Sequence, residues 1–160
     1  MRKHIIGYGL FCLLLVMVLI ACKKSNSVKT KTKTELLSDS VWRFSTIGID
    51  QNNDNLIDYP LPTAVLPVCE VDNLYTFNVD STGILDQGKE KCNAATSQKT
   101  PFTWKFLKNE TEISTSVNIL PIFEGAAQII TLNETTFTLS KAITVLGVPT
   151  PLKIVAVMIH

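Results

Sequence analysis

The chain has 160 residues, of which 46% are hydrophobic and 18% charged, and its formal net charge is +1 at pH 7. This length accommodates an export signal and one domain with a sizeable core. Residues 34–160 hold eight Lys or Arg against fourteen Asp or Glu, which argues against a nucleic-acid partner because such domains carry the opposite excess.

The first 22 residues have the order of an export signal. An N-terminal Met-Arg-Lys leads into an apolar run from Leu10 to Ile20, and a small residue then precedes Cys22. The run is shorter than the roughly 20 residues that a transmembrane helix needs. Counting from Ile5 gives a marginal length, so an uncleaved membrane helix is the alternative.

The stretch Leu19-Ile-Ala-Cys22 resembles the lipobox of bacterial lipoproteins. The resemblance implies that residues 1–21 are a signal peptide, cut before Cys22, and that this cysteine carries the lipid. Acyl chains that each contribute ~0.8 kcal/mol per buried CH₂ anchor a protein stably when several are attached. We therefore expect a lipid-anchored protein of the outer membrane. Lys23 and Lys24 follow the cysteine in place of an acidic cluster, which favours the periplasmic face over the cell surface.

Residues 22–34 are predicted to be a lipidated, flexible tether. Residues 23–33 hold five lysines and no acid, which suits a segment close to anionic lipid headgroups. A merely solvated tail is the alternative. Residues 35–160 are predicted to form one domain.

Two cysteines are left for that domain, Cys69 and Cys92, once Cys12 leaves with the signal and Cys22 is lipidated. An even pair in an oxidising envelope compartment predicts a disulfide. Closing a loop of about 24 residues contributes roughly 3 kcal/mol in the chain-entropy model. A metal pair is the alternative, although no histidine or further cysteine stands nearby.

The domain is predicted to consist mainly of antiparallel strands. A helical turn over 34–39 precedes a strand over 41–47, in which Trp42, Phe44 and Thr46 share one face. Alternating or apolar runs predict seven further strands, over 73–79, 84–87, 102–106, 112–117, 126–132, 136–140 and 153–159. Turn residues such as Asp80-Ser-Thr-Gly83 and Asn133-Glu-Thr135 join them. The last strand is apolar on both faces, so we expect it to be covered on both sides, with the helical turn outside.

Eight strands with inward aromatic side chains and no long helix predict an all-β fold. Because short turns join nearly all of them, an antiparallel up-and-down β-barrel is favoured, with a β-sandwich as the alternative. The interior of such a barrel is either filled by side chains or holds one small ligand.

Several stretches together resemble the lipocalin-like domain of Bacteroidetes lipoproteins, over roughly residues 35–159. The stretches that carry the resemblance are Leu36 to Phe44 with its Trp42, Cys69 to Phe77, Asp80 to Gly83, Lys91-Cys92 and Phe102 to Phe106. The resemblance implies a lipocalin-like β-barrel. It also implies a bridge between the two cysteines that flank the first hairpin.

The inward aromatic side chains are the candidate ligand-binding residues: Trp42, Phe44, Tyr75, Phe77, Trp104 and Phe106. The predicted function is that of a lipid-anchored envelope lipoprotein that holds a small hydrophobic ligand among them. The alternative is a filled core, in which case the domain is predicted to be a protein–protein interaction module of the envelope.

Residues 50–58 resemble a calcium-binding loop in their spacing. The predicted ligands are Asp50, Asn52, Asp54, Asp58 and the carbonyl of Leu56. Against a calcium site, Asn55 stands where glycine is expected, and Asx-rich stretches also form ordinary connections. A weak structural calcium ion is the only cofactor that the sequence suggests.

Catalysis finds little support in the residues after the signal. They include one histidine, His160, and no Gly-x-Ser-x-Gly motif. A protein without enzymatic activity is predicted.

Asp39-Ser-Val41 and Asp80-Ser-Thr82 resemble the O-glycosylation signal of Bacteroidetes envelope proteins. The resemblance implies Ser40 and Ser81 as acceptors.

Overall fold

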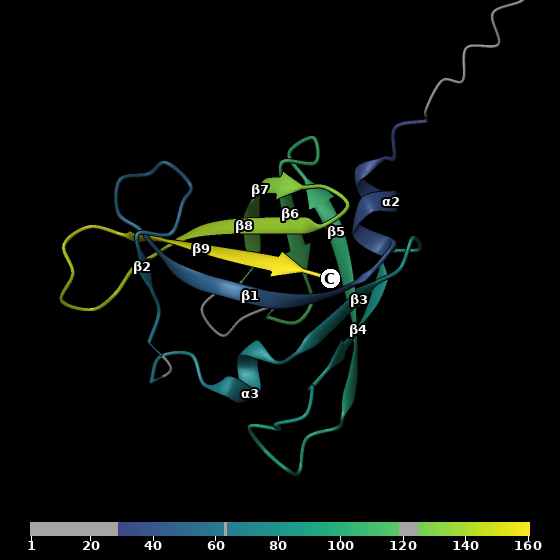
Figure 1. Cartoon of the computed structure of the whole chain (residues 1–160), viewed down its shortest axis with the longest axis horizontal. Coiled ribbons are helices and arrows are strands. Elements are labelled where there is room, and N and C mark those ends of the chain that lie inside the picture. Colours follow the sequence, from purple (N-terminus) through teal and green to yellow (C-terminus); the bar gives the residue numbers. More distant parts are fainter. Residues whose placement is uncertain (1–28, 63, 119–124) are drawn as a thin grey trace, which may run out of the picture. The chain divides into compact units, whose positions relative to one another are not determined.

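An antiparallel sheet that closes on itself forms the body of residues Lys31–His160 (Figure 1). The structure is a computed structural model that describes residues 29–62, 64–118 and 125–160. The predicted signal peptide, residues 1–21, and the lipidation site Cys22 lie outside these ranges. So does the first half of the predicted tether.

Nine strands are present in the described part of the domain, and eight of them form the barrel wall. The eight are β1 (Val41–Asp50), β3 (Leu74–Phe77), β4 (Thr82–Asp86), β5 (Lys99–Leu107), β6 (Glu112–Thr115), β7 (Ala126–Leu132), β8 (Thr136–Ile143) and β9 (Leu152–Ile159). Consecutive strands pair antiparallel, and β9 returns to pair with β1. The ninth strand, β2 (Tyr59–Pro60), adds two residues to the edge of β1. The predicted all-β, up-and-down barrel is confirmed, and the alternative sandwich does not form.

Period-two alternation directs the aromatic side chains into the barrel. Along β5, Phe102 and Trp104 are buried, whereas Thr103 and Lys105 are exposed. Asx turns close the hairpins: Asp80 Oδ1 accepts a hydrogen bond from the Thr82 amide at 3.0 Å, and Asn133 Oδ1 accepts one from the Thr135 amide at 2.9 Å. These bonds reverse the chain within a few residues, and both predicted hairpins are confirmed.

A β-bulge in β1 makes one detail of the predicted pattern wrong. Strict alternation places Thr46 inside with Trp42 and Phe44, but the pairing with β9 shifts register between Phe44 and Thr46. Ser45 and Thr46 are therefore both exposed, and Ile47 belongs to the core instead. One extra residue in a ladder reverses the faces of all that follow.

A short helix, α2 (Lys33–Ser38), covers one end of the barrel (Figure 1). A capping box of Thr32 and Glu35 satisfies its first amides. Leu37 is fully buried, and its carbonyl accepts a hydrogen bond from Trp42 Nε1 at 2.8 Å. His160 packs edge-on against the same tryptophan, with ring centroids 5.3 Å apart. The predicted helical turn is confirmed, and it closes this end of the barrel.

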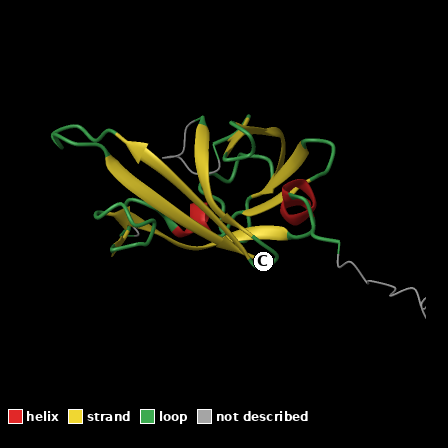
Figure 2. Cartoon of the chain, turned by 90° about the horizontal axis from the view of Figure 1, so that it is seen from above, coloured by secondary structure: helices red, strands yellow, loops and turns green. Residues whose placement is uncertain are grey.

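The long connections lie at the opposite end of the barrel. Strand direction alternates, so the segments that follow β1, β4, β6 and β8 all leave from the end away from α2; Figure 2 shows α2 and the β8–β9 hairpin on opposite sides. The connection after β1 contains a single helical turn, α3 (Val68–Val71), which begins after Pro67. The elements predicted from the sequence do not include this turn, so α3 is an addition.

The outer face of β9 is covered, but not by the element that the sequence suggests. Val155 is buried on this face, beneath residues Asp54 to Ile57 of the loop after β1, whereas α2 contacts mainly β3 and β7. Gly48 permits this cover, because a Cβ there would lie 2.3 Å from Ile57 Cγ2.

Candidate functional site

The six aromatic residues predicted to line a ligand pocket all belong to the barrel core or pack against it. Their rings contact one another edge to face: Phe77 lies 5.3 Å from Phe102, 5.9 Å from Trp104 and 6.3 Å from Phe137 between ring centroids. Burial raises the pKa of the Tyr75 hydroxyl well above its ordinary value. The aromatic side chains thus pack against one another in the barrel core, and their role as a ligand pocket stays a prediction.

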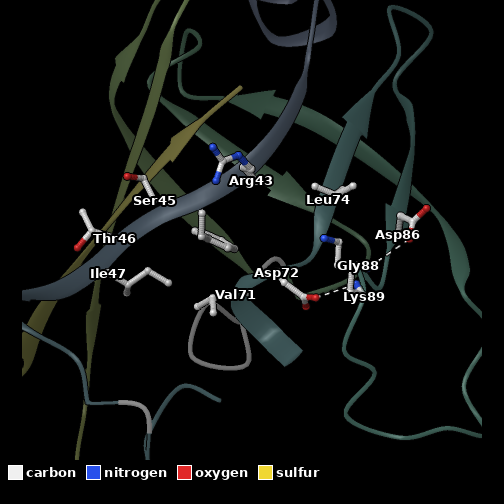
Figure 3. A pocket seen from close by; sticks show the side chains of 11 residues that line it. Arg43, Ser45, Thr46, Ile47, Val71, Asp72, Leu74, Asp86, Gly88 and Lys89 are labelled. Carbon is white, nitrogen blue, oxygen red and sulfur yellow. Dashed lines mark hydrogen bonds between the residues drawn. The ribbon is translucent and has the colours of Figure 1, made fainter. Parts of the chain in front are cut away.

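A cleft opens instead where β1 and β3 part. The β1–β3 ladder ends at the pair Arg43 and Leu74, and β2 joins β1 only at Gly48, so the intervening residues of β1 have no strand partner on that side. The cleft measures about 690 Å³. Its lining consists of Arg43, Phe44, Ser45, Thr46, Ile47, Val71, Asp72, Leu74, Asp86, Gly88 and Lys89 (Figure 3).

The floor of the cleft is apolar and its rim is polar. Phe44 and Ile47 contribute edges of the barrel core, being 6% and 5% exposed, while Val71 and Leu74 come from α3 and β3. Only Phe44 among the six predicted aromatic residues lines this cleft. An apolar floor with a few polar groups at the edge is the composition of small-molecule sites, which measure roughly 300–1,000 Å³.

The acidic side chains at the rim are engaged by the protein, apart from Asp72 Oδ1, which is buried without a hydrogen-bond partner among the described residues. Asp72 Oδ2 accepts hydrogen bonds from the amides of Lys89 and Glu90 at 2.7 and 2.9 Å (Figure 3 shows the first). Asp86 accepts a hydrogen bond from Gln98 Nε2 at 2.7 Å and lies 3.7 Å from the ammonium of Lys99. These bonds hold the rim in place and offset much of its negative charge.

Arg43, unlike these acidic side chains, is not engaged at the rim. Its side chain projects from β1 (Figure 3), and its guanidinium has no hydrogen bond or ion pair with any of the described residues. A guanidinium presents five donors in a planar fork that matches a carboxylate or phosphate. The ammonium of Lys89 likewise has no ion pair with the described residues, so both cations of the lining are unengaged.

A disulfide fixes the wall of the cleft that faces β1. Cys69 in α3 is bonded to Cys92, with Cα atoms 5.1 Å apart, which confirms the predicted pairing. The bond joins α3 to the connection after β4, and each supplies lining residues. This wall thus depends on a covalent link between segments distant in sequence.

The predicted calcium loop is organised around a lysine. Lys153 Nζ lies 2.8 Å from Asp50 Oδ2 and donates to Asn55 Oδ1 at 2.7 Å. Burial raises the pKa of Asp50, but the bonds from Lys153 and from backbone amides outweigh it, so the pKa is below its ordinary value. Asp58 accepts a hydrogen bond from the Gln51 amide, and Asp54 one from the Leu56 amide.

The described ranges contain no group of three or more His, Cys, Asp or Glu placed to hold a metal ion. Calcium binding through Asp50, Asn52, Asp54, Leu56 and Asp58 stays a prediction.

The two predicted glycosylation sites differ in accessibility. Ser81 is exposed at the β3–β4 hairpin with a positive φ of 68°, whereas Ser40 is half-buried between α2 and β1. Modification of either serine stays a prediction.

Most of the cleft residues are not apparent from the sequence. Val71 ends α3, whereas Asp72 and Lys89 belong to irregular segments, and only the end of the β1–β3 ladder and the disulfide bring these residues opposite Phe44. The one available signal is the cysteine pair, which predicts that the two connections meet.

None of the helices in the described part of the chain is long and apolar enough to cross a membrane. Comparison with models of known protein families and with curated proteins gave no match to this sequence. The eight-stranded antiparallel barrel is compatible with a lipocalin-like fold by its architecture alone.

Proposed function

We propose that this protein is a lipid-anchored envelope lipoprotein whose lipocalin-like barrel binds a small, mainly apolar ligand in the cleft between β1 and α3. The export signal and Cys22 support attachment to the outer membrane, on its periplasmic face. The disulfide agrees with an oxidising compartment. The proposed protein is a carrier or sensor without enzymatic activity.

The cleft carries this proposal. It combines an apolar floor made by Phe44, Ile47 and Leu74 with the unengaged guanidinium of Arg43. An apolar floor favours a hydrophobic ligand through the area it removes from water. A free guanidinium at the rim favours an acidic group on that ligand. The ligand proposed is therefore an amphiphile with an apolar body and a carboxylate or phosphate at one end.

Native mass spectrometry of residues 23–160, produced by export and purified gently, tests ligand binding. We expect a species heavier by the mass of one small amphiphile. Leu74→Arg places a charge in the cleft, and it should reduce the bound fraction at least tenfold. Val41→Arg, at an exposed position of β1 outside the cleft, is the matched control and should bind as the unchanged chain does.

The acidic end of the ligand is tested separately. A hydrogen bond to a charged group contributes about 1.5–3 kcal/mol, so Arg43→Gln should weaken binding by roughly tenfold or more. Lys105→Gln, which removes an exposed cation from β5, should have no effect. Equal affinity of both variants would show a neutral ligand, and a protein that carries no added mass would contradict the proposal.

A protein–protein interaction module is the second candidate, because the aromatic side chains in the barrel core contact one another. A domain without bound ligand that crosslinks reproducibly to one envelope protein would favour this function.

A further inference from the structure

Exposed hydrophobic side chains are concentrated at one end of the barrel. Eight large hydrophobic residues are exposed in the described part of the chain. Two of them, Val41 and Val79, lie at the α2 end, where β1 starts and β3 has ended. The other six come from the connections after β1 and β8 and form what we call the loop-end surface: Leu56, Tyr59, Val65, Val68, Val145 and Leu146. Exposed apolar patches mark interaction surfaces, and the segments that carry these six side chains all leave from this end of the barrel.

Leu146 is the most exposed of the six. Its exposed fraction is 102%, and it lies at the tip of the β8–β9 hairpin. The Val148 amide donates to the Val145 carbonyl at 3.0 Å, and Gly147 has a φ of +85°. This is the geometry of a type II turn, whose third position favours glycine. The turn presents Leu146 at its second position, on a ladder that pairs β8 with β9 along its whole length.

The charges around this tip do not favour a charged partner. No Asp, Glu, Lys or Arg occurs from Ala142 to Leu152. Lys153, which follows, is bound to Asp50 and Asn55, while Asp54 is exposed in the neighbouring loop. A surface without an excess of cations has little attraction for anionic headgroups or polyanions.

We propose that the loop-end surface inserts into a lipid bilayer through hydrophobic contact, with Leu146 as the deepest residue. The six side chains project from separate segments, and a fluid bilayer receives such protrusions without a complementary shape. Tyr59, which is 58% exposed, suits the headgroup level because its ring is apolar and its hydroxyl polar.

The inference goes beyond the proposed function but takes from it the lipid on Cys22, which keeps a bilayer nearby. The nine Cα–Cα steps from Cys22 to Lys31 span at most about 30 Å. That reach is comparable with the roughly 26 Å of an eight-residue strand. The tether thus lets the domain lie along the bilayer with its loop end in contact.

Vesicle sedimentation tests the proposal on residues 23–160 without the lipid, so failure of the predicted anchor cannot affect the result. Pure phosphatidylcholine vesicles are used, because they do not attract the tether lysines. We expect the chain to sediment with them at any salt concentration.

Leu146→Asp should lower the partition coefficient about tenfold or more, given the free energy usually gained by burying a leucine side chain. Val79→Asp, at a position 70% exposed at the other end, should change it less than about twofold.

Insertion depth gives a second readout. In Leu146→Trp, the new fluorophore should shift to shorter wavelength with vesicles and be quenched by brominated acyl chains, whereas Val79→Trp should show neither effect. Three results would overturn the proposal: no binding to neutral vesicles, equal binding of both aspartate variants, or a dimer in solution that Leu146→Asp dissociates.

Discussion

Asp50 shows how a single buried carboxylate organises a connection. Asp50 is 2% exposed at the end of β1. Its carboxylate accepts hydrogen bonds from the amides of Asp54 and Asn55 and forms an ion pair with Lys153. A buried charge is tolerated when a partner and hydrogen bonds satisfy it. The loop that covers β9 therefore depends on Asp50 being ionised.

Stability should respond to acid through this residue. The pKa of Asp50 in the folded protein is lower than its ordinary value of 3.8. Its contribution to stability is therefore complete above that ordinary value and is lost as the pH falls through the folded value.

We expect Asp50→Asn to lower the melting temperature at neutral pH, because Lys153 loses its ion-pair partner. The difference from the unchanged chain should narrow below about pH 4. Thermal unfolding followed by circular dichroism over a pH series measures this, and a difference independent of pH would contradict it.

At the scale of elements, α3 and the connection after β4 stabilise each other. A four-residue helix is too short to be stable alone. It is held by the disulfide at Cys69 and by Asp72, which binds the amides of Lys89 and Glu90. Together these bonds keep one wall of the cleft opposite β1.

Cys92→Ser should therefore destabilise the fold and loosen the cleft. For a loop of this length the expected loss in the free energy of unfolding is about 3 kcal/mol. Equilibrium denaturation of the variant measures it, and the unchanged chain under reductant should show the same loss. The disulfide lies outside the paired strands of the barrel, so the strand content measured by circular dichroism should be retained. Unchanged stability in both experiments would contradict this role.

At the scale of the whole molecule, β9 decides whether the sheet has edges. It pairs with β8 from Thr136 to Ile143 and with β1 from Arg43 to Asp50. It also brings Ile154, Ala156 and Met158 into the core. Closure leaves few backbone groups of the wall strands free to pair with another chain, whereas an open sheet exposes two full edges.

A chain that ends at Pro151 should thus fail to form a soluble monomer. Without β9, the edges of β1 and β8 and part of the core become exposed, so we expect aggregation during refolding. Size-exclusion chromatography after dilution from denaturant measures this. A chain that lacks only His160 is the control and should remain monomeric, and a monomeric, folded chain ending at Pro151 would show that closure is dispensable.

Local patterns of the sequence were sufficient to predict the barrel. Alternation in β5 and the Asx turns at Asp80 and Asn133 act over a few residues, so they can be recognised without knowledge of the partner strands. The cysteine count predicted the disulfide for a similar reason, since only two cysteines remained to pair. The order of charge, apolar run and cysteine likewise predicts export and lipidation without reference to the fold.

Only the tertiary structure decided where a cavity lies. The same inward aromatic residues suit a hollow or a filled barrel, and their edge-to-face contacts around Phe77 exist only once the sheet has closed. The bulge at Ser45 and the early end of the β1–β3 ladder depend on how strands distant in the sequence pair with one another. The cleft of Arg43, Leu74 and Lys89 follows from them. Local periodicity reports which side of a strand faces the core, but the separation between strands depends on pairing across the whole chain.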